Sequence, residues 1–139
     1  MPVEHYKTLG FDKLNKKLLA LDTDLAWKAL RQAGRETMKP VRDEIRAGAN
    51  FDKDSEGKHM RDSISIRIRK GSRKSRQRAA TIKVGPTGPH AHKALAQEFG
   101  TKRQKAEPFI KKSFAKKRHS LLTNLHRFMK RRVDNAMKK

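Results

Sequence analysis

The sequence predicts an α+β protein in which a small antiparallel sheet packs against a long N-terminal helix and a long C-terminal helix. Apolar residues recur at helical spacing toward both ends of the chain, whereas residues 63–69 and 80–85 alternate apolar and polar side chains as half-buried strands do. The chain has 139 residues, and only 35% of them are hydrophobic. We therefore expect a single domain over residues 1–139 with one modest core.

Residues 11–47 predict two helices. A leucine stripe indicates the first: Leu14, Leu18 and Leu21. The second carries apolar residues at helical spacing: Ala26, Leu30, Ala33, Val41 and Ile45. Asp22 or Thr23 is a suitable N-cap for the second helix, and Gly48 is a suitable stop. Because Pro40 has no backbone N–H, we expect it to kink this helix rather than split it.

Residues 62–85 predict a pair of strands joined by a basic loop. The isoleucines of "SISIRIR" alternate with serine and arginine, and Ile82 and Val84 face inward in "ATIKVG". The loop, residues 70–78, has five basic side chains among its nine residues and no acidic one. Such a cluster predicts weak contact with DNA phosphates regardless of base sequence. The DNA-facing candidates are Arg69, Lys70, Arg73, Lys74, Arg76 and Arg78.

Residues 91–99 predict a short helix that leads into a corner of the chain. Ala91, Leu95 and Phe99 are spaced so that its apolar side meets the core. Gly100 can adopt the positive φ that ends a helix, and the basic spacer "TKRQKAE" then forms an exposed loop. Glu98 can hydrogen-bond to the backbone of this corner or pair with an arginine.

Residues 108–137 predict the long C-terminal helix. Pro108 suits a first helical position, and Phe109 can pack beneath the corner. Lysine and arginine fill most of the remaining faces of the helix. Its apolar stripe consists of Ile110, Phe114, Leu121, Leu125, Phe128 and Val133. We expect four phenylalanines to serve the core: Phe99, Phe109, Phe114 and Phe128.

Positive charge increases along the chain. The net charge is +3 in residues 1–50, +7 in residues 51–100 and +12 in residues 101–139, for a total of +22. Such a field concentrates polyanions, above all nucleic acid, and equally favours docking onto an acidic protein. The composition therefore predicts an anionic partner of one of these two kinds, and the alternative is a basic face that is simply solvated.

The sequence has no motif that predicts catalysis or the binding of a metal or cofactor. Without cysteine the chain has neither disulfides nor thiolate ligands. "DKDSEG", residues 52–57, has the start of a calcium loop, but Ser63 occupies the position that needs a bidentate glutamate. His90 and His92 lack a third ligand nearby, and the acids are too scattered to hold magnesium for a nuclease. No segment is apolar enough for a membrane span or a secretory signal, so we expect synthesis in the cytosol.

A set of ordered motifs resembles a known family. "FDKLNKKLLAL" and "AWKALRQAG" come first, and "MRDSI", the strand pair and "VGP" follow. "HKALAQEFGT" (residues 92–101) and "AEPFIKKSF" (residues 106–114) then precede a charged final helix. In this order and spacing the chain is similar to the tail-completion, or head-tail joining, proteins of long-tailed bacteriophages, which are also known as minor tail components. The corner from "EFGT" to "PF" is the most specific part of the resemblance.

The resemblance implies a structural role in the virion. Such proteins form a ring in the neck, between the head connector and the tail-tube or tail-terminator proteins, through which duplex DNA passes. They have no catalytic function, and they assemble in the host cytoplasm. By this likeness the corner residues support the fold or the ring interface: Glu98, Phe99, Gly100, Thr101, Pro108 and Phe109. The alternative is a free-standing, sequence-indifferent nucleic-acid-binding protein, which is expected to present stacking aromatics or a recognition helix.

Overall fold

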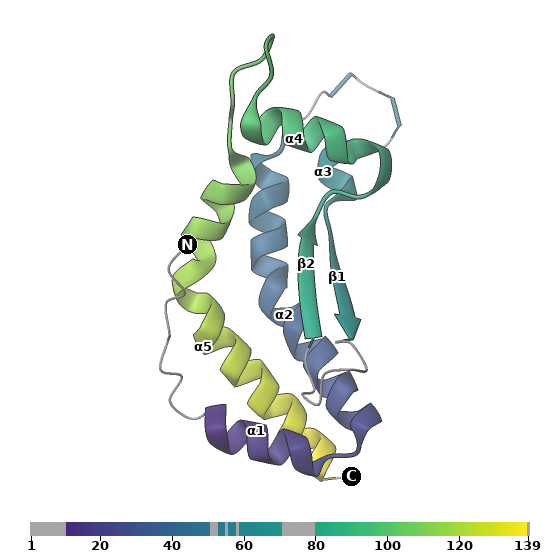
Figure 1. Cartoon of the computed structure of the whole chain (residues 1–139), viewed down its shortest axis with the longest axis vertical. Coiled ribbons are helices and arrows are strands. Elements are labelled where there is room, and N and C mark those ends of the chain that lie inside the picture. Colours follow the sequence, from purple (N-terminus) through teal and green to yellow (C-terminus); the bar gives the residue numbers. More distant parts are fainter. Residues whose placement is uncertain (1–10, 51–52, 55, 58, 71–79, 139) are drawn as a thin grey trace.

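The computed structural model describes residues 11–50, 53–54, 56–57, 59–70 and 80–138. Within this part the predicted α+β class, with a two-stranded antiparallel sheet and long helices toward both ends, is confirmed (Figure 1). The elements in chain order are α1 (Phe11–Ala20), α2 (Thr23–Gly48), α3 (Met60–Ser63), β1 (Ser65–Lys70), β2 (Ala80–Gly85), the 3-10 turn η1 (Gly88–His90), α4 (Ala91–Phe99) and α5 (Phe109–Met137).

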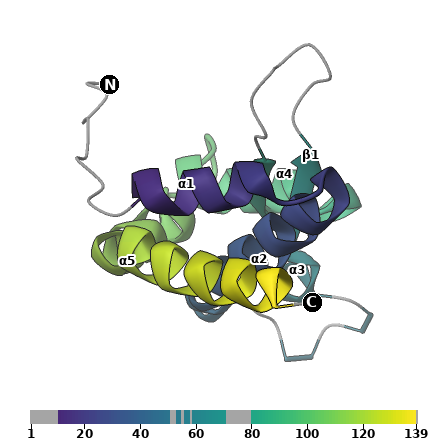
Figure 2. The ribbon, with the colours of Figure 1, turned by 90° about the horizontal axis from the view of Figure 1, so that it is seen from below.

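The longest elements set the shape of the molecule. Helix α2 lies between the two-stranded sheet and α5, and it packs against both (Figure 1). Helix α4 lies across one end of this arrangement, beside α3. At the opposite end α1 packs against α5, as the view from below shows (Figure 2). The two ends of the molecule are therefore built from different short helices.

The sheet packs on α2 through the inward face predicted from its alternation. Strands β1 and β2 are antiparallel, with Ile66 opposite Val84 and Ile68 opposite Ile82. Gly34 makes the close packing possible, because a Cβ there would lie 2.6 Å from the Cδ1 atom of Ile82. The outward face of the sheet is basic, since Arg67 is paired with Lys83.

Helix α2 has the predicted boundaries to within one residue. The carboxylate of Asp22 accepts a hydrogen bond from the Thr23 backbone N–H at 2.9 Å, and the helix ends at Gly48. It runs through Pro40 without being split. In its last turn Arg46 donates two hydrogen bonds, of 3.0 and 2.7 Å, to the carbonyl oxygen of Ile64. Arg46 thereby fixes the start of β1 against the end of α2.

The buried side chains form two clusters rather than the one core that the sequence predicted. The first joins α1, the first half of α2 and the end of α5. The second joins the second half of α2, α3, α4 and the start of α5. The reason is geometric: α2 and α5 are 26 and 29 residues long, so their short partners cover the two ends of the pair separately. Between the clusters the Thr37 hydroxyl is buried and donates to the Ala33 carbonyl at 2.7 Å.

Helix α5 approaches α2 closely, and ion pairs flank this contact. Glu36 pairs with Arg132, and Glu44 accepts a hydrogen bond of 2.8 Å from Lys116. The hydrogen bond and the charge of Lys116 lower the pKa of the Glu44 carboxyl. The acidic side chains of α2 therefore offset part of the positive charge of α5, in which Asp134 is the only acid.

The expected core role of Phe114 is wrong, because its side chain is 45% exposed. The buried face at the start of α5 consists of Phe109 and Ser113 instead. Gly48 of α2 faces them, and a Cβ there would lie 3.1 Å from the Cβ of Phe109. This close approach turns Phe114, one position further around the helix, toward solvent.

Candidate functional site at the corner between α4 and α5

The corner begins with a turn that only glycine fits well. Gly100 has φ of 76°, in the region that other residues rarely adopt. A Cβ at this position would lie 2.9 Å from the Ala106 backbone nitrogen and 3.1 Å from the Gln104 carbonyl oxygen. The chain therefore folds back tightly on itself directly after α4.

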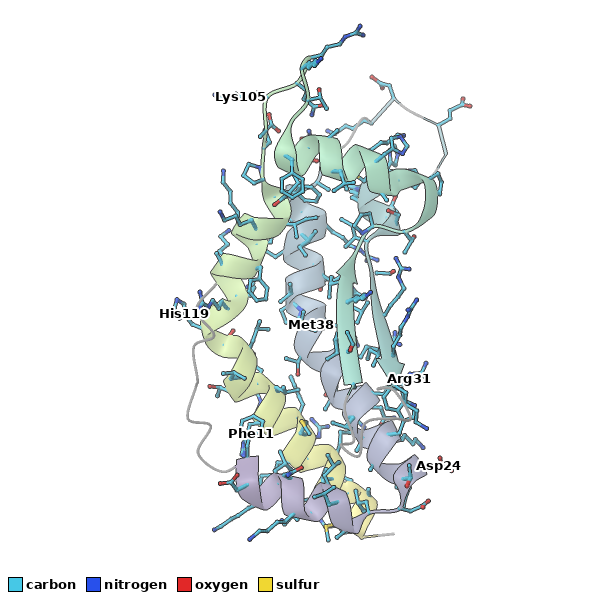
Figure 3. The ribbon with its side chains drawn as sticks, in the orientation of Figure 1. Phe11, Asp24, Arg31, Met38, Lys105 and His119 are labelled. Atoms are coloured by element: carbon cyan, nitrogen blue, oxygen red, sulfur yellow. The ribbon has the colours of Figure 1, made fainter. Side chains whose placement is uncertain are left out.

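Backbone hydrogen bonds hold the loop that follows. Thr101 donates its N–H to the Gln104 carbonyl at 2.9 Å, and the Thr101 hydroxyl accepts from the N–H groups of Arg103 and Gln104. Glu107 closes the loop by donating its N–H to the Gln97 carbonyl at 2.7 Å. The loop projects beyond α4, as the position of Lys105 shows (Figure 3). We call its three exposed cations, Lys102, Arg103 and Lys105, the basic tip.

Glu98 caps the helix on the far side of this loop. Its carboxylate accepts hydrogen bonds from the backbone N–H groups of Ile110 at 2.8 Å and Lys111 at 3.0 Å. The first N–H groups of a helix have no partner within the helix, and Pro108, at the N-cap position, provides no side-chain hydrogen bond. Of the two partners predicted for Glu98, the structure shows the backbone.

Gln97 attaches the corner to α2, which the sequence did not predict. Its side chain is only 3% exposed. The amide nitrogen donates to the Gly48 carbonyl at 3.0 Å, and the amide oxygen accepts from the Asn50 N–H at 2.9 Å. One side chain thus satisfies the carbonyl of the last residue of α2 and an N–H two residues further along the chain. The sequence signal was slight: Gln97 shares a helix face with Ala94, three residues earlier.

The apolar face of α4 points away from the core, so the expected core role of Leu95 and Phe99 is wrong. Their side chains are 58% and 74% exposed. The buried residues of α4 are Ala94 and Gln97 instead. Because Gln97 and Glu98 must reach the ends of α2 and α5, the helix turns these polar residues inward and leaves Leu95 and Phe99 outside. The predicted burial of Phe109, in contrast, is confirmed: it is 5% exposed.

The predicted DNA-facing residues lie elsewhere in the molecule. Arg69 and Lys70 are exposed at the end of β1, which points away from α4 (Figure 1). The Lys70 ammonium lies 5.5 Å from the ring centroid of Trp27, within the range of a cation–π contact. The remaining four candidates, Arg73, Lys74, Arg76 and Arg78, lie outside the described residues. The corner and the end of β1 therefore form two separate surfaces.

Compared with known protein families, residues 12–100 match the one described as "Bacteriophage HK97-gp10, putative tail-component". The chain belongs to this family. The match extends from α1 through α2, the sheet and α4 to Gly100, and thus ends where the corner begins. Neither the curated proteins nor the solved structures gave a significant match.

The metal sites considered from the sequence can be checked in the described part of this HK97-gp10-like tail component. It contains no group of three or more histidine, aspartate or glutamate side chains placed to hold a metal ion. The start of the calcium-loop pattern falls partly on residues outside the described part. None of the helices described here is long and apolar enough to cross a membrane. The features that distinguish its surface are exposed apolar side chains and positive charge.

Proposed function

We propose that this phage tail component acts in the neck of the virion, where it completes the tail and joins it to the head as a ring around the DNA channel. The observation that carries the proposal is the corner: a hydrogen-bonded turn there has an exposed aromatic side chain, Phe99, followed within six residues by the three exposed cations of the basic tip. Membership of a tail-component family supports a structural role, and the order of the sequence motifs supports the neck in particular.

The corner is the proposed docking surface for a neighbouring neck protein. Phe99 and Leu95 are one helical turn apart, so they form one apolar patch on α4. Buried aromatic anchors surrounded by polar groups dominate the energy of protein interfaces. The basic tip forms such a rim and favours an acidic surface on the connector, the tail tube or the tail terminator.

The basic face of the sheet is the proposed contact with DNA. Arg67 and Lys83 lie opposite each other on the outward face, and Arg69 lies further along the same strand. Lysine and arginine contacts to phosphate carry no base specificity, as a channel through which the whole genome passes requires. Arg73, Lys74, Arg76 and Arg78, between the strands, are assigned to the same contact by their charge.

The high positive charge of the chain supports a ring that forms only on a template, namely duplex DNA or the connector. Each subunit carries +22, so identical subunits repel one another, most strongly at low ionic strength. We expect light scattering to give a monomer for the pure protein, and a larger species once duplex DNA or the connector is added. Electron microscopy of that species is expected to show a closed ring with a central hole. A stable ring of pure protein at low salt would contradict templating, and the absence of rings on the connector would contradict the neck role.

Binding to duplex DNA is expected to be weak, indifferent to sequence and steeply dependent on salt. With about four phosphate contacts, affinity should fall about 100-fold between 50 and 200 mM salt. Arg69→Gln combined with Lys83→Gln, which removes two exposed cations of the outward face, should lower the slope of log affinity against log salt by about 2 relative to the unmodified protein. The control is Lys16→Gln with Lys39→Gln, which removes the same charge from exposed positions on α1 and α2. Fluorescence anisotropy across salt concentrations measures the affinity and the slope for each protein. Tight binding to one particular sequence, or an affinity that does not change with salt, would contradict a passive lining of the DNA channel.

A further inference from the structure

A cavity between α1 and α5 is surrounded by positive charge. Its volume is about 250 Å³, and it is lined by Lys13, Leu14, Lys17, His126 and Lys130. It lies at the opposite end of the molecule from the corner, where α1 packs against α5 (Figure 2). Neither the proposed docking surface nor the proposed DNA contact on the sheet includes these residues.

The charged and polar residues of this cavity come as two pairs, one on each helix. Lys13 and Lys17 are four residues apart on α1, and His126 and Lys130 are four residues apart on α5. Residues at this spacing lie on the same face of a helix. Two such pairs therefore face each other across the groove, with the buried side chain of Leu14 as the floor. The His126 ring is oriented by edge-to-face packing on Phe11, with centroids 5.0 Å apart.

The charges of the groove are only partly compensated. Lys17 forms an ion pair of 3.1 Å with Asp134, which is not among the residues that line the cavity. The side chains of Lys13 and Lys130 have no hydrogen-bond or ion-pair partner among the described residues. Like charges held on two packed helices repel each other, so α1 is docked at an electrostatic cost. An anion in the groove would remove that cost and would link α1 to α5.

We propose that this groove binds a phosphate group. Three ammonium groups and an imidazole offer hydrogen-bond donors from both walls, and a tetrahedral oxyanion has acceptors in directions that match several donors at once. The volume of about 250 Å³ is several times the roughly 30 Å³ that one water molecule takes, so a phosphate fits with its bridging waters. The phosphate comes either from the backbone of duplex DNA or from a free phosphate ion. The proposal does not depend on the neck role.

The test uses the full-length protein and two double variants. Lys13→Gln with Lys130→Gln removes one cation from each wall of the groove, while Lys16→Gln with Lys39→Gln removes the same charge outside it. All four lysines are exposed, so both variants are expected to fold, as circular dichroism will check. Inorganic phosphate, compared with chloride at equal ionic strength, should raise the thermal midpoint of the unmodified protein and of the control. Phosphate should leave the thermal midpoint of the groove variant unchanged, because the affinity of that variant for phosphate should be lower by about tenfold or more.

A second arm identifies the source of the phosphate. If the ligand is the DNA backbone, the groove variant should lose about tenfold more affinity for a 20-base-pair duplex than the control does. If both variants bind the duplex equally while only the groove variant loses inorganic phosphate, the ligand is the free ion. A thermal midpoint that responds to phosphate equally in all three proteins, or in none of them, would overturn the proposal.

Discussion

Phe109→Ala is expected to lower the free energy of unfolding by about 3–5 kcal/mol, the usual cost of truncating a buried aromatic residue. Phe109 is 5% exposed and belongs to the cluster that joins α2, α3, α4 and α5. Even a single Cβ added at Gly48 would lie 3.1 Å from the Cβ of Phe109, so the helices have little room to close over the space that the ring leaves. Domains have only about 5–15 kcal/mol of stability in total, so a large fraction of this variant should be unfolded at 37 °C. Denaturant titration followed by circular dichroism measures the change.

Phe114→Ala is the matched control for that experiment. The same ring is removed from the same helix, five residues later, at a position that is 45% exposed. Its cost should be no more than about 1 kcal/mol, because most of the ring is already in water. If Phe109→Ala left the unfolding midpoint unchanged, the ring would not be the contact that holds α5 to the end of α2.

Local patterns predicted most of the helices and strands because their causes lie close together in the sequence. The alternation around Ile66 and Ile82 gave both strands, and Gly100 gave the end of α4 through its backbone conformation. Asp22 and Gly48 likewise marked the ends of α2. Each of these features depends on neighbours within a few residues, which is the range that periodicity and capping describe.

The orientation of α4 could not be predicted in this way. Its inward face is decided by Gln97, whose partners are 47 and 49 residues away at the end of α2, and by Glu98, whose partners lie beyond the loop. Hydrophobic periodicity assigns the inward face to Leu95 and Phe99, and it has no means of recognising polar side chains that satisfy the ends of other helices. The groove between α1 and α5 was missed for a related reason, because its two lysine-bearing walls are more than 100 residues apart along the chain.

Phe99 was expected in the core but is exposed, and its replacement is expected to have the largest functional effect. Phe99→Ser should leave the fold intact but strongly reduce the joining of heads to tails. At 74% exposure, and as the last residue of α4, the ring contributes little to stability, so the unfolding free energy should change by about 0.5 kcal/mol or less. Loss of an aromatic anchor typically costs an interface about 2 kcal/mol or more, which corresponds to about 30-fold weaker binding.

In the assay, tails that lack this protein are mixed with filled heads and with the purified variant. Joined particles are then counted by electron microscopy and by infectious titre. Leu19→Ser is the control, because Leu19 is also an exposed apolar residue, 52% exposed, on α1 at the other end of the molecule. We expect the control to join heads to tails as the unmodified protein does, since α1 lies far from the corner (Figure 1). If Phe99→Ser joined normally while keeping its fold, the aromatic side chain beside the basic tip would not be the docking anchor, and the neck contact would have to be sought on another face.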